Sequence, residues 1–329
     1  MNGPTADGAL CTERTPRVVA ARKLLRRAGR ERAGRFLAEG AQAVGSALDA
    51  LLDASHAGSL GSDPAARLGP DGPIGSRAVS VAVGSHAGPE PAGRTGRVRV
   101  AELFATPAAA ERNSGLLATA GAAGVPVSLV TERAAAALSE TVTPQGLVAV
   151  CGLLDVPLDE ALTGAARLVV VLVGASDPGN AGTVIRVADA AGADAVLLAG
   201  DAVDPHNGKC VRASVGSVFH LPLARERDLA TVLAGCRRAG LRLLAATAGG
   251  EVDLHDPAAE ATLSGPAAWL LGSEAHGLPD EVAAAADARV RVPIYGRAES
   301  LNLATAASVC LYATARAQRT ARISSNEAR

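Results

Sequence analysis

The chain has 329 residues, a formal net charge of −1 at pH 7, and 48% apolar against 20% charged residues. This length suits about two domains with a substantial core, which excludes a wholly disordered or fibrous protein. No apolar run approaches the roughly 20 residues that cross a bilayer, and the first ten residues lack the apolar stretch of a secretory signal, so we expect a cytoplasmic protein.

Cysteine and aromatic usage narrows the kinds of binding site. The five cysteines stand singly, without the paired spacing of a metal site, so we expect reduced structural thiols and no bound metal. Aromatic residues make up 2% of the chain, which argues against RNA recognition by bases stacked on an aromatic sheet. Any nucleic acid would therefore be bound mainly by arginines and backbone amides.

The N-terminal segment is predicted to be helical. Residues 1–12 have the composition of a disordered lead-in, whereas apolar residues recur at three- and four-residue steps over residues 14–54. Interruptions near Gly29 and Gly40 predict two helices, or a helix and a short strand-like link.

The same segment carries a local basic run. Nine Arg or Lys residues lie between Arg14 and Arg35, and Glu31 is the only acid among them. Such a run can neutralise RNA phosphates, or it can be the solvated face of a helix.

A small α/β domain is predicted over residues 13–155. Residues 55–97 are rich in Gly, Pro, Ser and Ala and predict a mobile insertion, with one possible strand at 78–83. A helix is expected through about residue 120, residues 156–165 are a predicted linker, and the remaining apolar runs predict strands at 98–104, 125–130 and 147–153.

The second half of the chain is more regular. Its short, continuously apolar runs predict strands at 168–173, 195–199, 218–221, 241–246, 268–271 and 288–292. The segments between them predict helices at 181–191, 205–214, 227–239 and 279–286, followed by a long helix at 301–318. Continuous apolar strands alternating with helices are typical of a parallel sheet covered on both faces. We therefore predict a doubly wound α/β domain over residues 166–320 and a tail at 321–329.

Ligands of such domains bind beyond the carboxyl ends of the strands, and three segments stand at those positions. In residues 174–193, Gly179 and Gly182 permit close backbone approach, Asn180 offers an amide, and a helix N-terminus follows. Asp201 follows the next strand, which keeps open a dinucleotide-binding oxidoreductase.

The other two segments are residues 270–279 and 292–303. In the first, Glu274 either serves a site or caps the following helix. In the second, Ser300 and Asn302 stand at the start of the last helix, where Ser300 could be a plain N-cap.

Taken together and in this order, the three segments resemble the SpoU/TrmH family of RNA ribose 2′-O-methyltransferases, in the SPOUT superfamily. Residues 209–222 add support, and the resemblance covers about half of the chain. The family's three motifs are matched by Asp177, Pro178, Asn180, Gly182, Arg186, Ala188 and Gly192, then Leu271, Gly272, Glu274 and Gly277, then Val292, Pro293, Ile294, Gly296, Ser300, Leu301, Asn302 and Ala306.

The first half resembles, more loosely, the ribosomal-protein-like α/β substrate-binding domain that often precedes this catalytic domain. The similar residues are 36–48 and 143–150. The chain departs from the family pattern at Asp177, where Asn is usual, at Ile294, where Met is common, and in the insertion at 55–97.

The resemblance implies a trefoil-knotted catalytic domain that transfers methyl from S-adenosylmethionine to an RNA ribose 2′-hydroxyl. It assigns activation of the hydroxyl to Arg186, with the site organised by Asn180, Glu274, Ser300 and Asn302. Because a guanidinium with a pKa of about 12.5 or above is a poor base, we expect Arg186 to stabilise the developing alkoxide. The implied cofactor contacts are Leu271, Gly272, Gly277, Ile294, Leu301 and Leu303, and the expected RNA contacts are Arg22, Lys23, Arg26, Arg27 and Arg212.

Family members are usually homodimers, and the last helix carries an apolar face that suits either a dimer interface or an intramolecular core. That face comprises Leu301, Ala304, Ala307, Val309, Leu311 and Tyr312. The separate N-terminal domain favours ribosomal RNA, of the large subunit, as substrate. The alternatives are a tRNA methyltransferase and a non-catalytic RNA-binding or ribosome-assembly factor.

Overall fold

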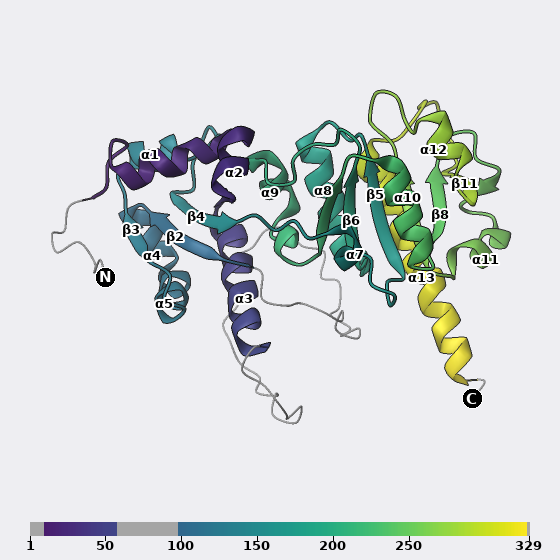
Figure 1. The fold of residues 1–329 in the computed structure, drawn as a ribbon, viewed down its shortest axis with the longest axis horizontal. Helices are drawn as coiled ribbons and strands as arrows, with labels where there is room; N and C mark the ends of the chain where they lie inside the picture. Colours follow the sequence, from purple (N-terminus) through teal and green to yellow (C-terminus); the bar gives the residue numbers. More distant parts are fainter. Residues whose placement is uncertain (1–9, 58–97, 328–329) are drawn as a thin grey trace.

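The computed structural model describes residues 10–57 and 98–327, which form two β-sheets joined side by side (Figure 1). Residues 1–9 of the predicted lead-in and the predicted strand at 78–83 lie outside the described residues. Where the lead-in is described, the prediction of disorder is wrong. Cys11 pairs with Val130, its N–H donating to the Leu129 carbonyl at 2.8 Å and its carbonyl accepting from Thr131 N–H at 3.0 Å.

The smaller sheet has four strands in the order β1-β4-β2-β3, in which β4 runs antiparallel to both of its neighbours and β2 and β3 are parallel. Helices cover both of its faces. The elements in chain order are α1 (Pro16–Arg22), η1 (Lys23–Leu25), α2 (Arg27–Ala33), β1 (Arg35–Glu39), α3 (Ala41–Ala57), β2 (Val100–Ala105), α4 (Pro107–Arg112), α5 (Ser114–Ala122), β3 (Val127–Leu129), α6 (Glu132–Ala137) and β4 (Leu147–Gly152).

The predicted helix break near Gly29 is wrong, because Gly29 lies inside α2. A Cβ at this position would come within 1.9 Å of the Lys23 carbonyl oxygen, so glycine is needed for α2 to pack closely against η1. Helix α2 ends instead at Gly34, and Gly40 separates β1 from α3; both have positive φ, at 62° and 93°. The predicted strand-like link is therefore the buried strand β1.

The larger sheet has seven strands in the order β7-β6-β5-β10-β8-β11-β9, and every neighbouring pair is parallel. The predicted parallel α/β fold is confirmed. Its elements are α7 (Leu158–Ala161), β5 (Leu168–Val173), α8 (Pro178–Ala191), β6 (Ala195–Ala199), α9 (Gly208–Ser214), η2 (Ser217–Phe219), β7 (Leu223–Glu226), α10 (Leu229–Arg238), β8 (Arg242–Ala246), β9 (Val252–Asp253), η3 (Pro257–Ala259), α11 (Glu260–Leu263), β10 (Ala267–Leu271), α12 (Asp280–Ala284), β11 (Ala288–Arg291) and α13 (Leu303–Glu327).

The strand predicted at 218–221 is wrong, because residues 217–219 form the short helix η2 and the edge strand β7 begins only at Leu223. Val218 and Phe219 are buried, but Phe219 packs on Phe36 of the smaller sheet, with ring centroids 5.9 Å apart. The apolar run is thus buried by contact between the two halves of the chain. The segment 156–165, predicted as a linker, contains helix α7.

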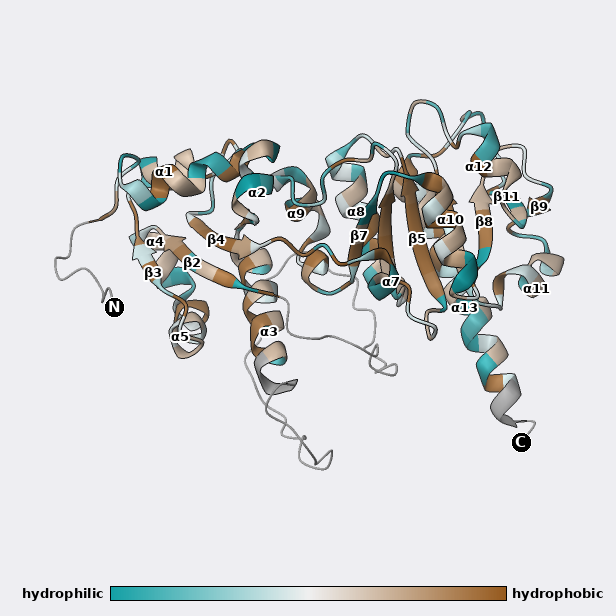
Figure 2. Cartoon of the chain, in the orientation of Figure 1, coloured by the Kyte–Doolittle hydropathy of each residue, from teal (hydrophilic) through white to brown (hydrophobic). Residues whose placement is uncertain are grey.

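Alternate side chains of the buried strands pack on opposite faces of the larger sheet, and Figure 2 shows these strands as mainly hydrophobic. Val169 and Val171 belong to a cluster with α7, α10 and α12. Val170 and Leu172 belong to a second cluster with α8 and α13, which continues without interruption into β1 and α3 of the smaller sheet. On that side, the buried Trp269 indole N–H donates to Thr314 Oγ1 of α13 at 2.9 Å.

Candidate active site at the carboxyl edge of the larger sheet

The first candidate segment turns sharply from β5 into α8. Gly174 has a φ of 62° and starts the turn, and Asp177 ends it as the N-cap of α8. Asp177 Oδ1 accepts from Asn180 N–H at 2.8 Å, and Pro178 occupies the first helical position, where its missing N–H costs nothing. These contacts hold Asn180 in the first turn of α8, at the carboxyl end of the sheet.

Asp177 has a second partner in Lys209 of α9, whose ammonium lies 2.6 Å from Oδ2. The hydrogen bond from Lys209, with further bonds from backbone N–H groups, lowers the pKa of Asp177 below its usual value. Asparagine, which is usual in the family at this position, could accept the capping bond but could not form the ion pair. Asp177, which departs from the family pattern, thus has an ion-pair partner in Lys209.

The second segment is a tight loop that follows β10. Ser273 and Gly277 exchange two backbone hydrogen bonds, of 3.0 and 2.9 Å, which close the loop around Glu274. A Cβ on Gly272 would lie 2.1 Å from the carbonyl carbon of Gly277, and Gly277 itself has a φ of 67°. Both glycines are therefore required by the loop itself.

The Glu274 carboxylate points from this loop to the first segment. Its Oε1 accepts from Asn180 Nδ2 at 2.9 Å, and its Oε2 accepts from both the N–H and the hydroxyl of Ser176 at 3.1 Å. Partial burial alone would raise the pKa of Glu274, but these hydrogen bonds outweigh it and hold the pKa below its usual value. Glu274 is thus an ionised acceptor with both oxygens engaged.

The third segment reaches the same place through Asn302, whose Nδ2 donates to Asn180 Oδ1 at 3.0 Å. Asn302 Oδ1 accepts from Ala304 N–H at 2.9 Å, so Asn302 caps α13. The suggestion that Ser300 is the N-cap is therefore wrong, and so is the suggestion that Glu274 caps the following helix. We call the chain of hydrogen bonds Glu274–Asn180–Asn302 the catalytic corner.

Two other predicted catalytic residues have no partner in the described part of the chain. Arg186 lies on α8, six residues after Asn180, and its side chain is exposed, with no hydrogen bond or ion pair to a described residue. Ser300 is exposed and likewise makes no hydrogen bond to a described residue. Both side chains are thus available to a ligand.

The residues between β11 and the corner present an unusual stretch of backbone. None of the N–H and C=O groups of residues 292–301 is hydrogen bonded to another described residue. Among the predicted cofactor contacts, Leu271 and Leu303 are buried, Leu301 is half-buried, and Ile294 is 38% exposed. Free backbone groups beside exposed and buried apolar side chains fit a ligand that combines an adenine ring with polar groups.

The predicted RNA contacts fall into two groups. Arg22, Lys23 and Arg26 are exposed along α1, η1 and the start of α2. Arg27 forms an exposed ion pair with Glu31, whereas Arg212 is half-buried and lies 3.5 Å from Glu39 of the smaller sheet.

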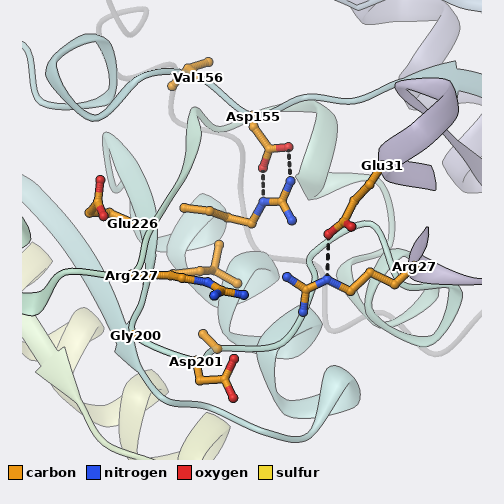
Figure 3. A pocket seen from close by; sticks show the side chains of 11 residues that line it. Arg27, Glu31, Asp155, Val156, Gly200, Asp201, Glu226 and Arg227 are labelled. Carbon is orange, nitrogen blue, oxygen red and sulfur yellow. Dashed lines mark hydrogen bonds and ion pairs between the residues drawn. The ribbon is translucent and has the colours of Figure 1, made fainter. Parts of the chain in front are cut away.

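Asp201, on which the oxidoreductase alternative rested, lines a pocket of about 360 Å³ between the two halves of the chain (Figure 3). Gly182, one of the glycines on which the oxidoreductase alternative also rested, is explained by helix packing. A Cβ on Gly182 would lie 2.3 Å from the Cys210 carbonyl oxygen, so glycine here permits α8 to pack on α9. In residues 10–57 and 98–327, no group of three potential metal ligands is found. No helix in the same part of the chain is long and apolar enough to span a membrane.

Ser176 and Lys209 are site residues that sequence reasoning missed. Ser176 directly precedes the first motif at a strand end, and Lys209 is one of only two lysines in an arginine-rich chain. Each position carried a signal that could have singled it out.

Comparisons with known proteins agree on one class. Residues 167–312 match the SpoU rRNA Methylase family, and residues 90–156 match the RNA 2′-O ribose methyltransferase substrate-binding domain. The 23S rRNA (guanosine(2553)-2′-O)-methyltransferase RlmP of Bacillus subtilis is 37% identical over 189 residues, 57% of this chain and 72% of the relative. The 23S rRNA (guanosine-2′-O-)-methyltransferase RlmB of Ralstonia nicotianae is 32% identical over 62% of this chain and 82% of the relative.

Solved structures are similar over nearly the whole chain. An AdoMet-bound rRNA methyltransferase from Sinorhizobium meliloti is 29% identical, with a TM-score of 0.70 over 94% of this chain and 97% of that one. The SpoU methyltransferase AviRb from Streptomyces viridochromogenes, in complex with AdoMet, is 26% identical, with a TM-score of 0.70 over 93% of this chain and 99% of that one. Fold and sequence thus define an RNA methyltransferase class. Within it, the chain belongs to the SpoU rRNA methylase family.

Proposed function

We propose that this protein transfers a methyl group from S-adenosylmethionine to a ribose 2′-hydroxyl of large-subunit ribosomal RNA. The observation that supports this most is the catalytic corner, because one chain of hydrogen bonds joins a residue from each of the three motifs. The RlmP and RlmB relatives, which are named as 23S rRNA 2′-O-methyltransferases, support the choice of RNA.

The residues of the chain contribute mainly alignment and electrostatics. When bound, S-adenosylmethionine supplies an electrophilic methyl group, so the attacking hydroxyl needs correct placement and stabilisation of its developing charge. Residues 292–301, with Leu271, Gly272, Gly277 and Leu303, would hold the cofactor through backbone groups and apolar contacts.

Arg186 is the residue proposed to stabilise the developing alkoxide. It carries a permanent charge, is exposed on α8, the helix that also carries Asn180, and has no competing partner in the described residues. Glu274 is a poor candidate for a general base, because its pKa is lowered and both of its oxygens already accept hydrogen bonds. We assign to Glu274, Asn180 and Asn302 the organisation of the site, and to Ser300 a contact with the ligand.

Three further expectations accompany this function. The chain would form a homodimer through α13, whose Tyr312 is 53% exposed while Leu311 and Ala307 on the same helix are buried within the chain. It would carry the trefoil knot of its family and act in the cytoplasm. Sedimentation at micromolar concentration tests the dimer, and a monomer would contradict it.

The direct test is incorporation of labelled methyl from S-adenosylmethionine into unmodified total RNA, separated into ribosomal subunit RNAs and tRNA and followed by nucleoside analysis. We expect one 2′-O-methylated nucleoside, in the large-subunit RNA. The same product in tRNA would establish the reaction with a different substrate. Cofactor binding without incorporation into any RNA would favour a ribosome-assembly factor.

A further inference from the structure

The two halves of the chain are joined by a buried ion pair. Arg30 of α2 donates from Nε and Nη2 to Asp204 Oδ2, at 2.8 and 2.7 Å, and the two side chains are only 4% and 6% exposed. Arg30 Nη1 also donates to the carbonyls of Leu24 and Leu25, each at 3.0 Å. All three guanidinium nitrogens of Arg30 therefore donate hydrogen bonds within the protein.

His206 connects the ion pair to the segment between the two sheets. The His206 backbone N–H donates to Asp204 Oδ1 at 3.0 Å, and the ring Nε2 accepts from the Leu154 backbone N–H at 3.0 Å. The ring also packs on Phe36 of β1, with centroids 4.7 Å apart. Burial alone would raise the pKa of Asp204, but the hydrogen bonds from His206 and Arg30 hold it well below its usual value. We call Arg30, Asp204 and His206 the interdomain lock.

The chemistry of the lock indicates positioning rather than stability. Removing two charges from water costs free energy that their attraction barely offsets, and a well-packed apolar pair at such a site is often equally stable. A planar guanidinium held by three acceptors, in contrast, permits only one orientation. The lock thus fixes the orientation of α2 relative to the segment that carries Asp204.

A second contact between the halves involves the turn between α9 and η2. Val215 and Gly216 both have positive φ, at 52° and 95°, and a Cβ on Gly216 would come within 2.2 Å of Ser46 Oγ in α3. A β-branched residue in this conformation is strained and persists only where the surroundings enforce it. The turn therefore packs closely against α3, beside the contact that the lock makes through α2.

The helix that carries Arg30 also lines a pocket at the carboxyl edge of the larger sheet. Arg27 precedes Arg30 by one helical turn and lines the pocket in Figure 3, where it approaches Arg227 beyond the end of β7. Arg227 has no hydrogen bond or ion pair to a described residue. Val203 N–H donates to the Ala175 carbonyl at 2.9 Å, which ties the pocket's loop to the turn that carries Ser176.

We propose that Arg30, Asp204 and His206 are positioning residues for RNA methylation. They hold α2 so that the RNA backbone contacts Arg27 and Arg227 from both halves of the chain while the target nucleotide lies at the catalytic corner. This inference rests on the proposed function and adds to it a surface and an orientation that both halves of the chain share.

Arg27 forms an exposed ion pair with Glu31 at 2.8 Å, which is weak enough for an RNA phosphate to displace. Asp201 and Glu226 also line the pocket, so the phosphate would bind to the guanidinium groups of Arg27 and Arg227, which point toward each other.

The test is the double variant Arg30→Met/Asp204→Leu, which removes both buried charges together. We expect its thermal unfolding and its affinity for S-adenosylmethionine to match the wild type, and kcat on unmodified large-subunit rRNA to change less than about twofold. The KM for that RNA should rise by about tenfold or more, because a small displacement of a positioning element is costly. Small-angle scattering should show a larger radius of gyration.

Arg238→Met is the matched control, since it removes an exposed ion pair with Asp159, 3.5 Å long, away from the lock. Arg227→Gln leaves the lock intact and should raise the KM for RNA without changing the scattering. Arg30→Lys keeps a charge opposite Asp204 but loses the planar fork. It should give an intermediate KM, and it serves as the test if the double variant does not fold.

Unchanged KM and scattering in the lock variants would overturn the proposal, and so would equal losses of RNA and cofactor binding, which indicate a merely structural role. If the wild type methylates no RNA, the proposed function fails. The scattering comparison then decides separately whether the lock holds the two halves together.

Discussion

Among single residues, Arg186 and Glu274 have opposite environments although both belong to the predicted catalytic set. Glu274 is saturated by Asn180 and Ser176, whereas Arg186 has no partner among the described residues. An organising residue needs its protein partners in place before substrate arrives, while a residue that stabilises charge in the transition state needs to be free for it.

Arg186→Ala should therefore lower methyl transfer by about 10²–10³-fold or more, the usual cost of removing one transition-state donor. Because the side chain is exposed and unpaired, the unfolding free energy and the affinity for S-adenosylmethionine should stay unchanged. Labelled-methyl incorporation, denaturant unfolding and calorimetric titration measure the three quantities. A folded variant with near-normal turnover would remove Arg186 from the mechanism.

Gly272→Ala tests the loop that carries Glu274. Its Cβ would lie 2.1 Å from the Gly277 carbonyl carbon, so the loop must shift, at a cost of about 1–3 kcal/mol in unfolding free energy. Affinity for S-adenosylmethionine should fall with it. Gly265→Ala, at a position with no neighbour within 4 Å, is the control and should change neither quantity. Wild-type stability and affinity in Gly272→Ala would contradict the assigned loop geometry.

At the scale of elements, α8 links the corner to the sheet through its capped first turn. Asp177 both caps the helix and pairs with Lys209, and substitution by Ala or by Asn separates these two effects. Asp177→Ala loses the cap and should cost about 0.5–2 kcal/mol. Asp177→Asn keeps a capping acceptor and loses only an exposed ion pair, which is worth about 0–1 kcal/mol.

The pH dependence of the Asp177→Asn difference has a defined sign. The folded-state pKa of Asp177 is lowered, so the ion pair stabilises the protein above the unfolded-state pKa of about 4 and is lost as pH falls through the folded value. The stability difference between wild type and Asp177→Asn should therefore shrink below about pH 4. Denaturant unfolding at pH 7 and at low pH measures it, and a difference that is the same at both would refute the ion pair.

For the whole molecule, the interdomain lock should make the effect of substituting Arg30 depend on whether Asp204 is substituted too. Arg30→Met leaves Asp204 charged, buried and uncompensated, and should lower the unfolding free energy by about 3–5 kcal/mol. Adding Asp204→Leu should recover most of this loss. Denaturant unfolding of the single and double variants provides the comparison, and additive losses would show that the two side chains do not form a buried pair.

The sequence allowed much of the larger sheet to be predicted, because fully buried parallel strands are continuous apolar runs. β5 and β6 have the predicted bounds. The prediction at 218–221 was wrong for the same reason that it was made: Phe219 is apolar and buried, but against Phe36, 183 positions away. Hydrophobic periodicity indicates that a residue is buried, but it does not indicate which residues it packs against.

For the site, the sequence by itself determined which functional groups the motifs supply: an amide and a guanidinium from the first motif, a carboxylate from the second and a further amide from the third. It could not show that Asn180 bridges Glu274 and Asn302, which lie 94 and 122 positions away. Nor could it separate Arg30 from its basic neighbours, because the sequence does not distinguish an arginine exposed to solvent from one buried against a carboxylate. Tertiary structure decided both, because contacts between distant segments exist only once the two sheets are docked.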